Sequence, residues 1–337
     1  MKSLTATLVL AVFTLPRLSA QGPLAPLAAP GPLMKSLDQI EPRTPISSLP
    51  FVISTSGSYY FTQNLQFTAV SGGAITINAS NVTLDLGGFT LSSTAAVTGR
   101  AINIGIHANI TVKNGTIAGN TTVAITGTAH SRTWTVTPAG FEMGIVDFST
   151  SCHYQDLSIR GCRVYGLINS GGGGTTLNKV AVSANGNHGI SCEFGSISNC
   201  VATSNGAIGI HAYSGSITNS TSSYNGESGV YSLYGTISST SAASNRTYGI
   251  FATSGSVNHA TATSNSGIGI YADSGSVTNC TATSNGSNGI SANSGSVTNS
   301  TARSNVATDL VASAAVVAFC KAGSMAVTGT LTGNLTP

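Results

Sequence analysis

Charged residues are scarce in this chain. They make up 7% of its 337 residues, and the formal net charge is only +3. Electrostatic binding to nucleic acid or to anionic membranes depends on clustered basic residues, so the composition predicts neither partner. Long apolar runs are missing as well. No stretch approaches the ~20 residues that cross a bilayer, which predicts a chain without a transmembrane segment.

The chain is instead rich in Gly, Ser, Thr and Asn, and its 40 glycines lie between short apolar runs. This composition is typical of an all-β chain with many turns. One Asn recurs at a constant spacing, at Asn185, Asn205, Asn225, Asn245, Asn265, Asn285 and Asn305. Four positions after each of the first six comes a Gly followed by Ile or Val, from Gly189-Ile190 to Gly289-Ile290. Such a period predicts a solenoid of stacked β coils.

The repeat also predicts what each coil buries. Alternation along the strands places the aliphatic residue after each Gly inside, together with a second series that begins at Ile197. The Asn side chains can hydrogen-bond between coils and satisfy the turn backbone. Left-handed β-helices repeat in hexapeptides, and a 20-residue coil is not a multiple of that unit. We therefore predict an all-β fold made of a single right-handed parallel β-helix.

The two ends of the chain differ from the repeat. Residues 1–20 have the pattern of a secretory signal peptide, with Lys2, an apolar run and a small-residue cleavage site at Ser19-Ala20. We expect a secreted, periplasmic or cell-surface protein. Residues 21–50 are predicted as a Pro/Ala-rich tether and cap entry, 51–310 as the β-helix and 311–337 as the final coil and cap. The segment 118–140 fits no repeat and is predicted as a projecting loop.

Six cysteines in an exported chain invite a disulfide prediction. Cys200, Cys280 and Cys320 share one position of the repeat, however, and strand spacing keeps even the nearest pair about 10 Å apart. We expect buried free thiols there. Aligning the segment that ends at Cys162 with the one that ends at Cys200 places Cys162 in the same column. Cys152 and Cys192 stand outside that column, and the sequence does not pair them.

The repeat units carry a family resemblance. Units such as Gly295-Ser296-Val297-Thr298-Asn299-Ser300 resemble the parallel β-helix repeats of the pectate-lyase-like superfamily. The entry segment from Pro50 to Tyr60, followed by Asn81-Val82-Thr83-Leu84-Asp85-Leu86, resembles the start of uncharacterised exported bacterial proteins of that superfamily. The resemblance covers roughly residues 50–310. It implies the fold but not one chemistry, because the superfamily includes lyases, hydrolases, epimerases and non-catalytic surface proteins.

One candidate catalytic cluster lies in the N-terminal coils. Alignment of the strands places Asp85, Lys113 and Arg160 in one outward column. The resemblance implies that a basic residue could abstract a proton beside a carboxylate, with Ca²⁺ neutralising the acid. Asp85, Asp147 and Asp156 could supply ligands to it. The simpler alternative is a cross-strand ladder in which Asp85 pairs with Lys113.

A second candidate is an outward aromatic column. His211, Tyr231, Phe251 and Tyr271 follow the buried aliphatic residue at 20-residue steps. Aromatic faces in a flat row suit stacking on sugar rings, and exposed patches of this kind often mark binding surfaces. These four residues are therefore the predicted carbohydrate-binding site. The alternatives are self-stacking that stiffens the solenoid, or cover from the segment 118–140.

These observations favour an exported protein that binds polysaccharide or another extracellular polymer. Two alternatives stay open: a polysaccharide lyase or epimerase that uses Asp85, Lys113 and Arg160, and a purely structural or adhesive surface protein. No metal site or cofactor is predicted, and Ca²⁺ enters only under the lyase alternative. The block from Asn185 to Asn305 contains five charged residues and no two acids on adjacent coils, which argues against catalysis there.

Overall fold

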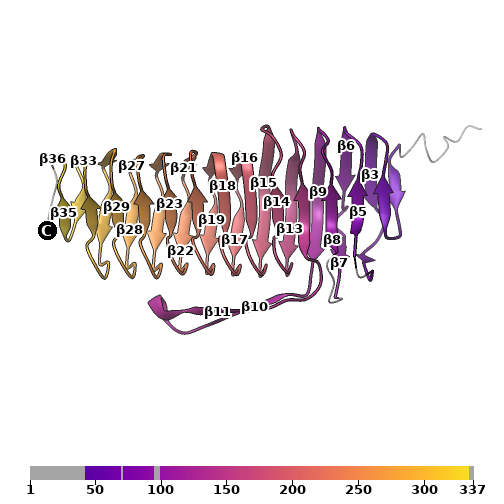
Figure 1. The fold of residues 1–337 in the computed structure, drawn as a ribbon, viewed down its shortest axis with the longest axis horizontal. Helices are drawn as coiled ribbons and strands as arrows, with labels where there is room; N and C mark the ends of the chain where they lie inside the picture. The colour runs from indigo at the N-terminus through magenta and orange to yellow at the C-terminus, as the bar shows by residue number, and fades with distance from the viewer. Residues whose placement is uncertain (1–41, 70, 95–98, 334–337) are drawn as a thin grey trace, which may run out of the picture. The chain divides into compact units, whose positions relative to one another are not determined.

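The computed structural model describes residues 42–69, 71–94 and 99–333. The predicted signal peptide, most of the tether and residues 334–337 lie outside these ranges. From Arg43 onward the described residues form one unit, a solenoid of parallel β coils (Figure 1). Its single described helix is the three-residue η1 (Ala129–Ser131). No helix among the described residues is long and apolar enough to cross a membrane.

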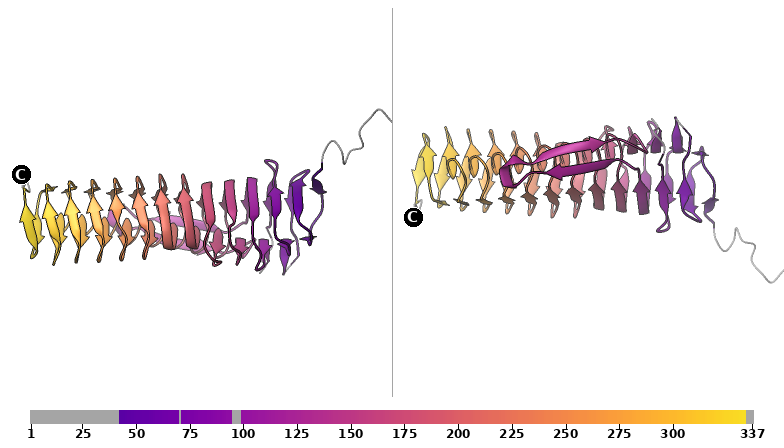
Figure 2. Two further views of the ribbon diagram at one scale, coloured as in Figure 1. Left: turned by 90° about the horizontal axis from the view of Figure 1, so that it is seen from above. Right: turned by 90° about the horizontal axis from the view of Figure 1, so that it is seen from below.

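Three stacks of parallel strands run along the solenoid (Figure 2). The first stack consists, in spatial order, of β2 (Phe51–Ile53), β5 (Gly73–Ile77), β8 (Arg100–Ile104), β12 (Met143–Asp147), β14 (Leu167–Asn169), the first half of β16 (Ile190–Ser198), the first half of β18 (Ile210–Thr218), β20 (Val230–Ser232), β23 (Ile250–Ala252), β26 (Ile270–Ala272), β29 (Ile290–Ala292), β32 (Leu310–Ala312) and β35 (Met325–Val327).

The second stack follows the same order. It consists of β1 (Thr44–Ile46), β3 (Gly57–Phe61), β6 (Val82–Asp85), β9 (Ile110–Ala118), β13 (His153–Arg160), β15 (Thr175–Ser183), the second halves of β16 and β18, β21 (Thr236–Ser238), β24 (Val257–Asn258), β27 (Ser276–Thr278), β30 (Ser296–Thr298), β33 (Val316–Ala318) and β36 (Thr330–Thr332).

The third stack begins with β4 (Leu65–Gln66) and β7 (Thr90–Ser92) and continues through the ends of β9, β13 and β15. It then contains β17 (Val201–Thr203), β19 (Thr221–Ser223), β22 (Ser241–Ala243), β25 (Thr261–Thr263), β28 (Thr281–Thr283), β31 (Thr301–Arg303) and β34 (Lys321–Ala322). Residues predicted as the final coil and cap continue the third stack to Ala322, the first to Val327 and the second to Thr332.

The predicted core is confirmed. The strand register advances by one sequence repeat per coil, so Ile250 pairs with Ile270, and Val257 with Val277. The aliphatic residues that follow each Gly, from Ile190 to Ile290, are fully buried. The second series, from Ile197 to Val297, is also fully buried. Each coil therefore supplies a few inward side chains, and stacking makes the core continuous.

A ladder of buried Asn side chains joins the coils at one corner. Asn245 is fully buried, and its Oδ1 accepts hydrogen bonds from the backbone N–H of Asn225 at 3.0 Å and from Asn225 Nδ2 at 2.9 Å. The pattern repeats on the other coils, and the carboxylate of Asp309 accepts the last pair from Asn305. The ladder satisfies turn backbone that the sheets leave unpaired, as predicted.

Cys162 does not lie in the column of Cys200. Its backbone N–H donates to Asn185 Oδ1 at 3.0 Å, so Cys162 stands at the head of the Asn ladder. The strand register explains the wrong alignment, because Ile159 pairs with Val182 and Leu177 pairs with Ile197. The coil that contains Cys162 is longer than the regular coils that follow it. Aligning the sequences at the strand ends therefore assigned Cys162 to the wrong turn of its coil.

The segment predicted as a projecting loop is an antiparallel hairpin that packs back on the solenoid. It is formed by β10 (Thr122–Thr126) and β11 (Thr133–Thr137) and lies along several coils (Figure 2). The Trp134 indole N–H donates to the Tyr224 carbonyl at 2.7 Å, and His130 Nδ1 lies 3.1 Å from the Asn265 carbonyl. Half-buried Val, Ile and Trp residues alternate along the hairpin with exposed Thr residues and Ala124, so its inner face needs the solenoid as a partner.

Replacing Asn245 with Ala should weaken the solenoid. The change leaves the buried backbone N–H of Asn225 without an acceptor and removes one of the acceptors of Asn225 Nδ2, and an unsatisfied buried group lowers stability by about 1–3 kcal/mol. We expect urea unfolding to show a loss of about 2 kcal/mol or more. The control is Asn187→Ala, because the Asn187 side chain makes no hydrogen bond in the described part of the chain. Equal losses in both variants would contradict a structural ladder.

All six cysteines should behave as inert thiols in the folded protein. They are buried and none forms a disulfide in the described structure, and burial raises the pKa of Cys152, Cys162 and Cys192 to about 12 and of Cys200 and Cys280 to about 11. The thiols are therefore protonated at pH 8, where thiolate is needed for reaction. We expect alkylation of six thiols only after unfolding. A disulfide, or rapid labelling of the native protein, would refute this assignment.

Candidate functional site

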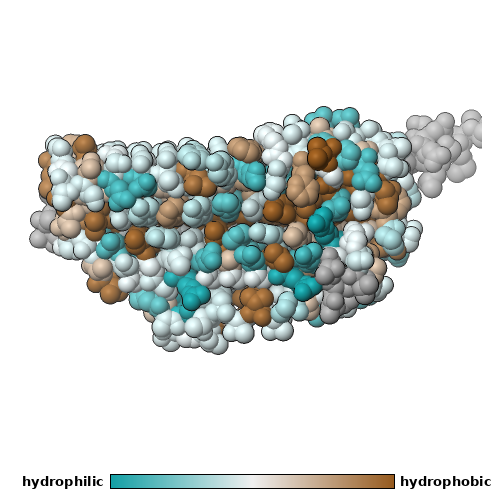
Figure 3. Space-filling model, in the orientation of Figure 1, coloured by the Kyte–Doolittle hydropathy of each residue, from teal (hydrophilic) through white to brown (hydrophobic). Residues whose placement is uncertain are grey.

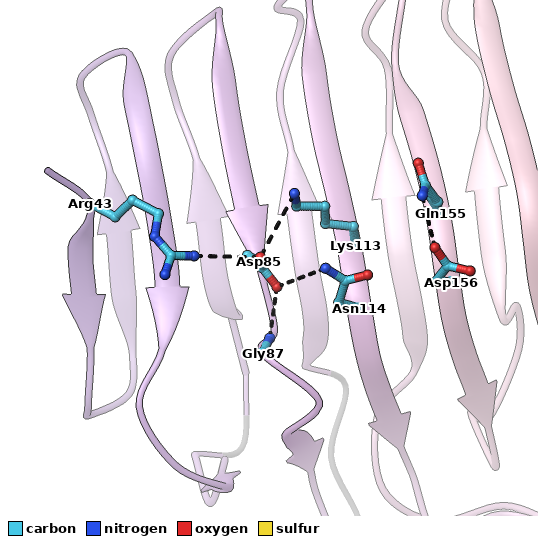
Figure 4. A network of polar contacts seen from close by, with 7 residues as sticks. All are labelled: Arg43, Asp85, Gly87, Lys113, Asn114, Gln155 and Asp156. Atoms are coloured by element: carbon cyan, nitrogen blue, oxygen red, sulfur yellow. Dashed lines mark hydrogen bonds and ion pairs between the residues drawn. The ribbon is translucent and has the colours of Figure 1, made fainter. Parts of the chain in front are cut away.

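Asp85 at the end of β6 lies between two cations (Figure 4). Its Oδ2 is 3.5 Å from Arg43 Nη1 and 3.8 Å from Lys113 Nζ. Its Oδ1 accepts hydrogen bonds from the Gly87 backbone N–H at 2.9 Å and from Asn114 Nδ2 at 3.3 Å. The carboxylate is thus fully engaged in holding neighbouring coils together. This is the cross-strand ladder that the sequence left as the alternative to catalysis.

Arg160 does not join Asp85 and Lys113, so the predicted three-residue column is wrong. Lys113 pairs with Gln155 in the strand register, whereas Arg160 pairs with Ala118 and Ser183 at the far end of β13. The hairpin between β9 and β13 lengthens that coil, and the alignment across it slipped along the strand. The geometry therefore brings together two of the three candidate catalytic residues.

The three aspartates considered as calcium ligands lie apart. Asp147 is fully buried inside the solenoid, where it accepts hydrogen bonds from the Tyr154 hydroxyl, Asn169 Nδ2 and the Ser149 backbone N–H. Asp156 lies 3.9 Å from Lys179 on the neighbouring coil. In the described ranges, no group of three or more His, Cys, Asp or Glu side chains could hold a metal ion. Asp147 therefore serves packing, because a ligand cannot reach it.

The aromatic column predicted from the repeat is present on the first stack. His211, Tyr231, Phe251 and Tyr271 pair in register on β18, β20, β23 and β26, and each is half-buried. We call these four residues the stacked row. The Tyr231 and Phe251 rings are 4.6 Å apart and 3° from parallel, and Phe251 and Tyr271 are 4.9 Å apart at 18°.

This geometry covers the ring faces. Parallel rings whose centroids are one strand spacing apart must stack face to face, because coplanar rings would overlap at that distance. Tyr231 and Phe251 therefore present their edges to solvent, and a sugar cannot lie on the face between them. The interpretation of the row as a flat sugar platform does not fit the stacked rings. Self-stacking, the alternative left open by the sequence, describes their contacts.

His211 begins the stacked row, and His188 extends it toward the N-terminus. His211 lies 5.3 Å from Tyr231 and 6.2 Å from His188, and its Nδ1 is 3.2 Å from Ser191 Oγ. His188 Nδ1 accepts the Ile208 backbone N–H. Burial, followed by the proximity of His211, lowers the pKa of His188 to about 4, and burial also lowers the pKa of His211. Both rings are neutral at pH 7, so the row carries no positive charge.

Three exposed aromatic residues lie beside the stacked row. Phe194, Tyr213 and Tyr234 are 39%, 40% and 56% exposed. Phe194 and Tyr213 meet at 5.9 Å and 67°, and Tyr213 and Tyr234 meet at 5.3 Å and 68°. We call them the exposed cluster. In an edge-to-face contact the edge of one ring covers one face of its partner, so these pairs leave more ring face open than the parallel rings of the row do. Sequence analysis missed the cluster because Tyr213 stands one position away from the column that Phe194 and Tyr234 share.

A shallow depression of about 390 Å³ adjoins the exposed cluster. Glycines and hydroxyl side chains surround Phe194 there: the lining contains Gly173, Gly174, Thr175, Thr176, Gly195, Ser196, Ser214, Gly215 and Ser216. Glycine is required at its floor, because a Cβ added to Gly215 would lie 2.0 Å from the carbonyl oxygen of Gly195. The depression thus offers an aromatic wall, a flat floor and hydroxyl groups, without a charged side chain.

The hydropathy of the surface agrees with this low charge. On the side of the molecule seen in Figure 3, residues of intermediate hydropathy cover much of the C-terminal coils, and hydrophilic and hydrophobic residues occur as separate patches.

Known proteins share this fold. Residues 144–278 match the model of a family described as right handed beta helix region. The Dettilon tailspike protein superposes with a TM-score of 0.54 at 14% identity, covering 85% of this chain and 61% of that one. The A-module of mannuronan C-5 epimerase AlgE6 from Azotobacter vinelandii superposes with a TM-score of 0.54 at 12% identity, covering 88% and 90%.

A pectate lyase, Pel9A, superposes with a TM-score of 0.42 at 12% identity, covering 78% of this chain and 70% of that one. No curated protein matches the sequence significantly. The predicted fold is confirmed: the chain forms a right-handed parallel β-helix. The chain spans less than two thirds of the tailspike, so that protein's activity does not transfer with the fold.

Changing Tyr231 and Tyr271 together to Ser should destabilise the protein. The double change removes three ring contacts along the stacked row, each of which contributes about 1 kcal/mol. We expect the free energy of unfolding to fall by about 3 kcal/mol in urea titrations. The matched control is Tyr213→Ser with Tyr234→Ser in the exposed cluster, where we expect a much smaller loss. Similar losses in the two variants would contradict the structural role of the row.

Proposed function

We propose that this protein is exported and binds a polysaccharide or another extracellular polymer through the exposed cluster. The observation that carries the proposal is the set of three exposed, non-parallel rings on successive coils beside a depression lined with glycine and hydroxyl groups. Export rests on the signal-peptide pattern of residues 1–20, which lie outside the described ranges.

Sugar rings have apolar C–H faces and hydroxyl edges, and the surface offers a partner for each. Phe194, Tyr213 and Tyr234 supply uncovered aromatic surface for the faces. Thr176, Ser196 and Ser216 supply donors and acceptors at the adjacent depression. Because the rings follow the coils, a polymer that lies across them can place several sugar units in contact. Repeated weak contacts along one chain then add up to useful affinity.

One structure with the same fold is named for a carbohydrate substrate. It is the A-module of a mannuronan C-5 epimerase. The epimerase module matches over most of its length, which supports a carbohydrate ligand for this fold. Identity is 12%, so this similarity supports the choice of ligand class and says nothing about the residues involved.

The arrangement of the charged residues in the N-terminal coils argues against a catalytic site there. A general base must be free to take a proton from substrate, but the ammonium group of Lys113 is 3.8 Å from the carboxylate of Asp85. Arg160, the other basic candidate, lies at the far end of β13. The lyase or epimerase alternative therefore has no assembled set of residues to support it in the described coils.

The triple change Phe194→Ser, Tyr213→Ser and Tyr234→Ser should abolish polymer binding without unfolding the protein. Loss of about 1 kcal/mol for each ring amounts to roughly a hundredfold loss of affinity. A glycan-array screen of the parent protein would identify the ligand, and titration would then compare the variant. Thermal melting serves as the control. Unchanged affinity would place binding elsewhere, and release of unsaturated uronate products by the parent protein would show it to be a lyase.

A further inference from the structure

A second hollow lies at the opposite end of the first-stack strands from the exposed cluster. It measures about 370 Å³ and is lined by Arg246, Thr247, Tyr248, Gly267, Ile268 and Ser287. All of these residues precede β23, β26 or β29, whereas the exposed cluster lies beyond the part of β16, β18 and β20 that belongs to the first stack. The hollow combines one guanidinium group, one aromatic ring, one apolar side chain and two hydroxyl groups.

Arg246 stands where the preceding coils have glycine. Gly186, Gly206 and Gly226 occupy this position on the three coils before it. A Cβ added to Gly206 or Gly226 would lie 2.1 Å from the carbonyl oxygen of the preceding glycine. The coil must therefore adjust to accept Arg246. A large charged side chain in a position shaped for glycine is a departure from the repeat that stacking alone does not require.

The charge of Arg246 has no carboxylate partner. Arg246 is exposed, and in the described part of the chain it forms no ion pair. The acidic residue on the preceding coil is Glu227, which is also exposed and whose carbonyl accepts the Thr247 backbone N–H. The guanidinium group is thus free to bind a ligand anion, and its planar donors suit two oxygens of a carboxylate or sulfate.

Tyr248 gives the hollow a sugar-binding wall. Its ring meets Phe251 at 5.0 Å and 65° and Tyr271 at 5.8 Å and 50°. The stacked row therefore holds Tyr248 at an angle and leaves it without a parallel ring on its face. Ile268 extends this apolar wall on the next coil. A sugar that packs against Tyr248 and Ile268 would keep its substituents close to Arg246.

The hairpin brings a positive charge to the coil before Arg246. Trp134 lies over Gly226, and His130 lies over Gly286. Arg132 stands between them in the sequence. Its guanidinium group lies 5.4 Å from the Tyr224 ring centroid, and its Nη1 is buried without a hydrogen-bond partner in the described ranges.

We propose that the hollow is an anion-selective sugar subsite. Arg246 binds the carboxylate or sulfate of one sugar unit, the sugar ring packs on Tyr248 and Ile268, and Arg132 adds a positive charge on the preceding coil. The inference rests on the proposed function in one respect, that the ligand is a sugar polymer. It adds that the polymer carries anionic groups, a property that the neutral exposed cluster does not select.

The test uses three probes with one backbone: dextran, carboxymethyl-dextran and dextran sulfate. The full protein and the variants Arg246→Gln and Arg132→Gln are titrated at low salt, with Arg303→Gln as the matched control because Arg303 is an exposed arginine of the third stack. We expect Arg246→Gln to weaken binding of at least one anionic dextran about tenfold. Arg132→Gln should have a smaller effect, and Arg303→Gln almost none. Preference for one anionic dextran identifies carboxylate or sulfate as the group bound.

The outcomes separate this subsite from the proposed function. Equal effects of Arg246→Gln and Arg303→Gln, or no binding of either anionic dextran, would overturn the subsite, because it is proposed to recognise charge. The triple Ser variant of the exposed cluster could then still lose binding of the ligand found on the array. Conversely, loss of anionic binding in Arg246→Gln, combined with no effect of the triple variant on any polymer, would support the subsite and reject the exposed cluster. Melting curves confirm that each variant is folded.

Discussion

Every feature of this molecule depends on the register between successive coils. Parallel backbone hydrogen bonds and the buried Asn ladder hold each regular coil one repeat ahead of the one before. Equivalent residues therefore stand directly above one another at about 4.8 Å. A repeated charge would face its own sign at this distance, and the sparse charge of the chain follows from that constraint. Asp85 does not face a like charge, because it lies between the cations of Arg43 and Lys113.

The same constraint decides which aromatic residues can meet a ligand. A ring repeated in register stacks on its own copy, so Tyr231 and Phe251 use their faces for stability. Rings that break the register, as Tyr213 does between Phe194 and Tyr234, meet edge to face and keep surface free. Arg246 follows the same logic, because it replaces glycine in a column of small residues. In this solenoid the perfect repeats build the scaffold, and the departures from them supply the candidate ligand contacts.

Residue positions could be predicted from the sequence where the 20-residue period is exact. They were predicted wrongly where the coil length changes. The inward aliphatic columns and the Asn ladder follow from counting along the repeat and were confirmed. Arg160 and Cys162 were misplaced because the N-terminal coils are longer: Val82 pairs with Ile110, and Thr111 pairs with His153 across the hairpin. Ring orientation could not be predicted either. A column of aromatic residues is compatible with flat or upright rings, and only their packing distance decides between them.

The hairpin packs on repeated glycines at one corner of the coils, and Arg246 is a departure from that column of glycines. Its inner face, which includes Val136 and Trp134, packs on the glycines that the coil register already requires at that corner. Glycine thus serves two purposes there: it allows coils to approach one another, and it leaves a flat track for the hairpin. Arg246 interrupts this column of glycines, and its side chain is exposed. It lines the hollow proposed as a subsite, so the departure from glycine turns a position shaped for close packing into a candidate ligand contact.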